Sequence, residues 1–76
     1  MPRITPQHWR TLVKLFEKDG FTQVRQASSH HVMEKDGVLR PVIIPEYTNI
    51  DINIISGLLR TAGMSRDRYF ELLAQV

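Results

Sequence analysis

The stretch QVRQASSHH, residues 23–31, decides how the middle of this chain folds. It joins the end of one expected strand, residues 21–27, to the start of a second, residues 30–35. The link between the two strands falls at residues 27–29. A link that short makes the strands antiparallel neighbours in one sheet, because parallel strands need a much longer crossover.

A third strand is expected directly after the second. Asp36-Gly37 is a strong hairpin signal, and the apolar residues 42–44 mark the centre of a strand over residues 38–45. Pro41 and Pro45 have no backbone N–H to donate to a sheet. The third strand is therefore expected at an edge of the sheet, or bonded on one side only.

Helices flank this sheet in the sequence. Thr5-Pro6 is typical of a helix start, and Gly20 of a helix end, which predicts a first helix over residues 6–19. Its apolar residues recur at helical spacing: Trp9, Leu12, Val13 and Phe16. The aromatic residues Trp9 and Phe16, like Phe21, are expected in the core and not on a base-stacking surface.

The second helix is expected over residues 50–62, begun by a capping box from Thr48 to Asp51 and ended by Gly63. Gly57 either weakens this helix by about 1 kcal/mol relative to alanine or lets another backbone approach. Ser65 should cap a short last helix that carries Tyr69, Phe70, Leu72 and Leu73. That helix either packs against its own core or meets a partner protein.

The predicted order is α-β-β-β-α-α in a single domain, residues 1–76. Packing favours an α+β fold, with a three-stranded antiparallel sheet and the helices on one face. The other sheet face is then left open to a partner. This is the layout of a double-stranded-RNA-binding domain.

Composition sets wide limits on function. The net charge of +2 and the isoelectric point of about 9.4 permit RNA binding without demanding it. The chain has no cysteine, which excludes disulfides and thiolate metal sites and suits a reducing cytoplasm. Residues 1–6 lack the apolar region of a signal peptide, and no run approaches the roughly 18 apolar residues of a membrane span.

Two adjacent histidines are the main chemical signal. Histidine changes charge near neutral pH and can take or give a proton there, while Arg25 could attract a phosphate. Adjacent strand residues face opposite ways, so His30 and His31 should not share a site or grip a metal. The alternation does not show which of the two histidines faces the core, because Val32 and Met33 are both apolar. The pattern suggests a small ribonuclease-like domain with one working histidine and no metal.

The sequence resembles the HicA family of toxins, also called YcfA-like proteins. The resemblance lies in the first helix, in the pieces around Gly20, Arg25 and residues 28–31, in residues 37–45, and in a second helix ending at Ala62-Gly63. It implies that this chain is the toxin of a toxin–antitoxin pair, and that the toxin cleaves messenger RNA. It also implies an antitoxin of the HicB type that blocks the catalytic histidine. We expect no cofactor.

The resemblance places the family's Gly-Ser-His motif on Ser28-Ser29-His30, so His30 inherits the catalytic role. Ser28 departs from the motif glycine, which adopts positive φ at low cost. Either the turn is less strained here, or serine tolerates it. We expect His30 to act as general acid or base on RNA, and Arg25, Ser28, Ser29 or backbone N–H groups to hold the phosphate.

Other readings of the same residues remain open. The fold would also suit a non-catalytic RNA-binding module, or a protein-interaction module that docks its open sheet face. His31 is expected to be structural, and His8 an ordinary surface residue. A basic row on the first helix either follows RNA or is a solvated face: Arg10, Lys14 and Lys18.

Overall fold

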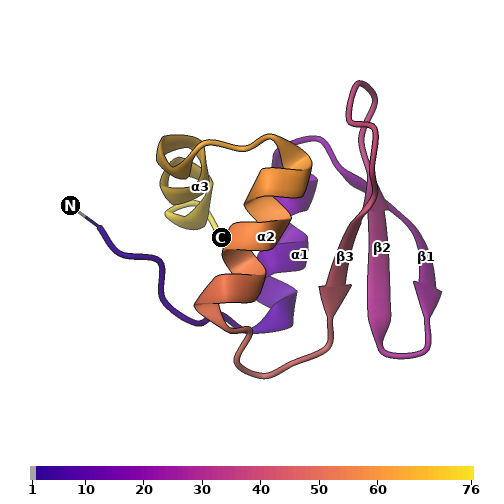
Figure 1. Ribbon diagram of the computed structural model, residues 1–76, viewed down its shortest axis with the longest axis horizontal. Coiled ribbons are helices and arrows are strands. Elements are labelled where there is room, and N and C mark those ends of the chain that lie inside the picture. Colours follow the sequence, from indigo (N-terminus) through magenta and orange to yellow (C-terminus); the bar gives the residue numbers. More distant parts are fainter. Residues whose placement is uncertain (1) are drawn as a thin grey trace.

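The computed structural model describes residues 2–76, in which one helix, three strands and two further helices follow one another (Figure 1). The helices are α1 (Trp9–Lys18), α2 (Ile52–Ala62) and α3 (Arg66–Leu73), and the strands are β1 (Thr22–Ala27), β2 (His30–Glu34) and β3 (Val42–Pro45). The predicted α+β class and element order are confirmed. Figure 1 shows the three helices gathered on one side of the sheet, nearest to β3.

The strands form one antiparallel sheet in the order β1-β2-β3. The short link pairs β1 with β2 as predicted, with Ala27 opposite His30. β3 is an edge strand, as its prolines indicated. A β-bulge interrupts β1 at Val24, between Gln23 and Arg25. All six residues of β1 are exposed, so this strand extends beyond the core that the helices cover.

Two predicted helix starts are wrong, and one contact explains both. The backbones of Gln7 and Ile50 form an isolated antiparallel bridge, with N–O distances of 3.3 and 2.7 Å. This bridge keeps both segments extended, so neither Pro6 nor residue 50 enters a helix. α1 is capped by His8, whose Nδ1 accepts from the Arg10 N–H at 3.1 Å, and not by Thr5.

α2 is likewise capped by Asp51 and not by Thr48. One carboxylate oxygen of Asp51 accepts from the Asn53 N–H at 2.9 Å. The other helix-end predictions are confirmed: Gly63 ends α2 in the left-handed conformation, and Ser65 caps α3. The end of α2 and the start of α3 are thus set by residues within a few positions of each helix end.

The third strand is shorter than predicted, because it begins at Val42 and not at residue 38. The Asp36-Gly37 turn is present, closed by a hydrogen bond from Val38 N to Lys35 O at 3.1 Å. After this turn the chain continues as an irregular loop to Pro41, which cannot donate to β2. The loop of residues 35–41 projects from the end of the sheet at the top of Figure 1.

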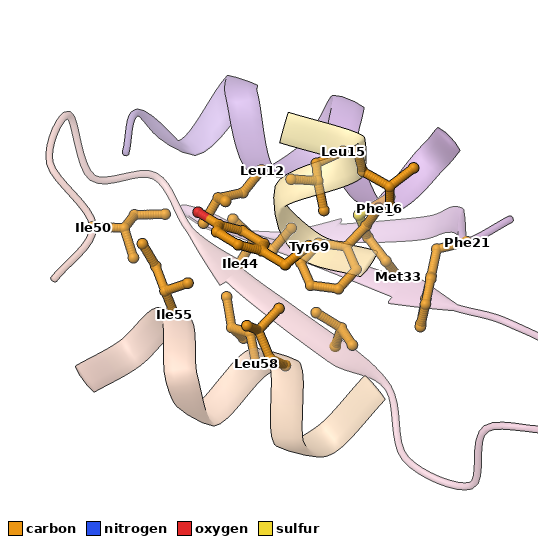
Figure 2. Packing of buried hydrophobic residues seen from close by; sticks show 13 residues of the cluster. Leu12, Leu15, Phe16, Phe21, Met33, Ile44, Ile50, Ile55, Leu58 and Tyr69 are labelled. Carbon is orange, nitrogen blue, oxygen red and sulfur yellow. The ribbon is translucent and has the colours of Figure 1, made fainter. Parts of the chain in front are cut away.

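The core lies between the sheet and the helices (Figure 2). Tyr69 is the largest fully buried side chain, and Figure 2 shows it among Leu12, Leu15 and Ile44. α3 therefore packs against its own core through Tyr69 and Leu72. Phe16 and Phe21 are buried edge to face, with centroids 5.3 Å apart, as expected of core aromatics. No helix within residues 2–76 is long and apolar enough to cross a membrane.

Candidate active site

The turn between β1 and β2 consists of Ser28 and Ser29, here called the serine turn. Ser28 has a φ of +58° and is the one non-glycine residue with positive φ among residues 2–76. A positive φ at the first central position alone is the pattern of a type II′ hairpin turn. Of the two alternatives above, the second is right: the turn keeps the glycine-like conformation, and serine tolerates it at a cost of about 1 kcal/mol.

Two hydrogen bonds hold the serine turn in place. The backbone N–H of Glu46 donates to the Ser29 carbonyl at 2.9 Å, and the Gln26 amide donates to the Ser28 carbonyl at 3.3 Å. Glu46 directly follows β3, so the first bond continues the β2–β3 ladder to the turn itself. The turn is therefore fixed from both neighbouring strands, although its side chains are exposed.

His30 lies directly after the serine turn, on the face of the sheet turned away from the helices. Across the sheet, Ala27, His30 and Pro45 form one row of partners. Arg25, Val32 and Ile43 form the next row but one, which faces the same way. Directly opposed residues in antiparallel strands point to the same face. We call this face, which carries Arg25, His30 and Ile43, the open sheet face.

Arg25 and His30 are diagonal neighbours on the open sheet face, at a separation that long side chains can bridge. Both residues are exposed. Within residues 2–76 neither side chain forms a salt bridge or a hydrogen bond. An exposed imidazole and an exposed guanidinium thus lie beside a turn with two hydroxyl groups, which suits contact with a phosphodiester.

His31 points to the opposite face, as the alternation of strand residues predicted. It is only 5% exposed and stacks on Trp9 of α1, with ring centroids 4.5 Å apart and planes inclined by 15°. Its Nε2 lies 3.4 Å from a carboxylate oxygen of Glu46. Neither ring nitrogen has an aligned hydrogen-bond partner within the described residues, so the contact with Glu46 is close but is not a hydrogen bond.

Sequence reasoning missed Glu46 as part of this region. The sequence pattern assigned no role to Glu46, whereas the backbone of this residue holds the serine turn and its side chain faces His31. The register of β2 on β3 would have found it, because His30 lies opposite Pro45. That register depends on where β3 begins, which the sequence alone placed too early.

The basic row of α1 is exposed along its length, at Arg10, Lys14 and Lys18. Arg10 lies over the Trp9 ring, with its guanidinium carbon 5.2 Å from the ring centroid. Among residues 2–76 no group of three or more histidine, aspartate or glutamate residues could hold a metal ion. The open sheet face and α1 therefore both offer exposed cationic groups.

A family of known proteins matches most of the folded chain. Residues 9–64 match the family model of the HicA toxin of bacterial toxin–antitoxin systems. The match covers more than half of the chain and includes α1, the whole sheet and α2. It confirms the family resemblance that the sequence motifs indicated. No curated protein and no solved structure shows significant similarity to the chain.

Proposed function

Because this chain belongs to the HicA toxin family of bacterial toxin–antitoxin systems, we propose that it is a metal-independent endoribonuclease that cleaves messenger RNA and so inhibits translation. His30 is its catalytic residue. The observation that carries the proposal is the separation of the two histidines. His30 is exposed on the open sheet face beside Arg25, whereas His31 is buried against Trp9.

The chemistry needs few groups, because RNA supplies its own nucleophile. The 2′-oxygen attacks the neighbouring phosphorus, the bond from phosphorus to the 5′-oxygen breaks, and a 2′,3′-cyclic phosphate remains. One proton leaves the 2′-hydroxyl and another reaches the departing 5′-oxygen. The His30 imidazole carries one of these protons, since histidine is the side chain best suited to general acid or base catalysis, and water or substrate carries the other.

Arg25, Ser28 and Ser29 hold the phosphate in this proposal. A guanidinium forms short, charge-assisted hydrogen bonds to phosphate oxygens and stabilises the negative charge that grows on them. Hydroxyl and backbone N–H groups of the serine turn lie next to His30 in the chain and can donate to the same oxygens. The arrangement supports binding and proton transfer at one place.

Membership in a toxin–antitoxin family implies an antitoxin partner. We propose that this partner is of the HicB type and that it covers the open sheet face, which makes His30 inaccessible to RNA. The activity belongs in the cytoplasm, where messenger RNA is translated. No small-molecule cofactor is part of the proposal.

Inducible expression of the wild type beside His30→Ala tests the proposal. The wild type should arrest growth, and the purified protein should cleave labelled RNA, whereas His30→Ala should do neither and yet fold normally. His8→Asn is the matched control, since it removes an imidazole but keeps a good helix cap. If His30→Ala cleaves RNA at the wild-type rate, the assignment is wrong. If RNA binds but stays intact with the wild type, the chain is an RNA-binding module.

A further inference from the structure

A groove lies beside the loop of residues 35–41, at the other end of the sheet from the serine turn and His30 (Figure 1). It has a volume of about 690 Å³ and runs between the loop of residues 35–41 and the C-terminal half of α2. We call it the α2 groove. The loop contributes one wall and α2 the other, through Val38, Leu39, Arg40, Gly57, Arg60 and Thr61.

The charge of the α2 groove is entirely positive. Arg40 and Arg60 line it, and no acidic residue does. Both arginines are exposed, and neither forms a salt bridge or a side-chain hydrogen bond within residues 2–76. Asp36 lies in the same loop but lines the neighbouring hollow instead. The two guanidinium groups are therefore available to an anion.

Two other cations of the chain contact a carboxylate within the described residues, whereas Arg40 and Arg60 do not. Lys35 and Arg68 both contact the Asp19 carboxylate, at 3.3 and 3.0 Å, and Arg68 also contacts Glu71. These contacts join the end of α1 to the residue after β2 and to α3. The α2 groove thus holds two arginines without a carboxylate among its lining residues.

Gly57 opens the α2 groove on the helix side. Gly57, Arg60 and Thr61 are three and four positions apart, so they share one face of α2. A Cβ atom at Gly57 would meet no heavy atom within 4 Å, so the close backbone approach considered above is wrong. The glycine makes room for a ligand beside Arg60, although glycine weakens a helix by about 1 kcal/mol relative to alanine.

We propose that the α2 groove binds backbone phosphates of the RNA substrate, at a second contact remote from the cleavage site. The inference rests on the proposed function only in taking RNA as the ligand. Arginine suits this role because its planar fork of donors matches the oxygens of a phosphate. A contact with phosphates alone would add affinity without reading the base sequence.

The position of the groove sets the length of RNA that can use it. β2 leads from His30 to the loop of residues 35–41, and the serine turn and this loop lie at opposite ends of the sheet (Figure 1). A strand of five residues spans about 16 Å at roughly 3.3 Å per residue. That is about five nucleotides of a strand stacked as in duplex DNA, at about 3.4 Å each. His30 lies on the open sheet face whereas α2 lies on the other side of the sheet (Figure 1), so the path is at least as long as β2. A stacked strand shorter than this therefore cannot contact both places.

Binding is measured in the His30→Ala background, by fluorescence anisotropy of a labelled single-stranded RNA over a range of salt concentrations. Arg40→Gln with Arg60→Gln should weaken binding about tenfold and reduce the salt slope by about 1.4, or about 0.7 for each lost phosphate contact. Arg3→Gln with Arg66→Gln removes the same charge elsewhere on the exposed surface and should change binding far less. Equal losses for the two pairs would show general attraction and overturn the site.

A second pair of variants tests the groove without removing an arginine. Gly57→Glu should weaken RNA binding severalfold more than Gly57→Gln, because the two side chains have nearly the same shape and only one repels phosphate. Both should unfold at or above the wild-type temperature, since each replaces a glycine within a helix. If both leave RNA binding unchanged, or affect only antitoxin binding, the groove does not bind RNA.

These assays also separate the two proposals. They measure binding with a protein that lacks His30, so a failure of the catalytic assignment would leave their outcome unchanged. Conversely, loss of the groove effect would leave the His30→Ala cleavage result standing.

Discussion

The indole of Trp9 and the imidazole of His31 lie stacked, with ring centroids 4.5 Å apart and planes inclined by 15°. The pair joins the first turn of α1 to the start of β2, one residue from His30. The Trp9 backbone also donates to the Tyr47 carbonyl at 3.1 Å, so α1 contacts the segment after β3 as well. The proposed catalytic residue therefore lies between the serine turn, which Gln26 and Glu46 hold, and a histidine that packs against α1.

The stacking of the His31 ring should contribute more to stability than its two nitrogen atoms do. His31→Ala should lower the free energy of unfolding by about 2–3 kcal/mol, because it leaves a cavity beside Trp9. His31→Phe should keep the stack and remove two buried nitrogens that lack aligned partners, so its stability should stay within about 1 kcal/mol of the wild type or rise. Urea denaturation measures both variants.

The His31→Phe variant also separates a packing role of His31 from a catalytic one. His31→Phe should retain RNA cleavage, because the proposed chemistry uses only His30. If His31→Phe folds stably and is inactive, His31 takes part in the reaction and the division between the two histidines fails.

The local signals in the sequence located every helix and strand, but a contact between distant residues moved two boundaries. Apolar spacing and turn residues were enough for the element order, because each signal acts within a few residues. The Gln7–Ile50 bridge joins segments that are far apart in the chain. No local pattern contains it, so Thr5 and Thr48 looked like helix caps.

Replacing each candidate cap tests this explanation. Asp51→Ala should lower the free energy of unfolding by about 1 kcal/mol, because it removes the acceptor for the Asn53 N–H. Thr48→Ala should change it by no more than a few tenths of that amount, since Thr48 makes no cap contact within the described residues. Thermal or urea unfolding distinguishes the two. A larger loss for Thr48→Ala would place the start of α2 earlier than the structure does.

The candidate site was predictable in part. Alternation along a strand predicted that the two histidines face opposite ways, and the structure agrees. The local pattern could not tell which one faces the core, because Val32 and Met33 are both apolar and both buried. The deciding residues are Trp9 and Glu46, which come from other elements and reach His31 only in the folded chain.

Tyr69 should make the protein less stable in alkali. Burial raises the pKa of its hydroxyl above the ordinary value of 10, because the interior disfavours the charged phenolate. The unfolded chain then releases this proton at a lower pH than the folded chain. The contribution of Tyr69 is fully present below about pH 10 and is lost as the pH rises toward the folded-state pKa.

Tyr69→Phe is the matched variant for this effect. It removes a buried hydroxyl with no hydrogen-bond partner among the described residues, so stability at neutral pH should be equal or higher. Above about pH 10, its free energy of unfolding should fall less steeply than that of the wild type. Urea denaturation at several pH values measures the slopes, and identical slopes would contradict burial as the cause.

Ser28→Gly should stabilise the serine turn. Ser28 has a φ of +58°, which glycine adopts without the steric cost that a Cβ brings. The variant should gain up to about 1 kcal/mol in the free energy of unfolding, less the entropy that a glycine adds to the unfolded chain. Ser29→Gly is the control, because Ser29 has no positive φ and its replacement should only destabilise.

If strain at Ser28 also misplaces His30, the Ser28→Gly variant should cleave RNA faster than the wild type. An unchanged cleavage rate with higher stability would mean that serine costs the protein stability but not activity.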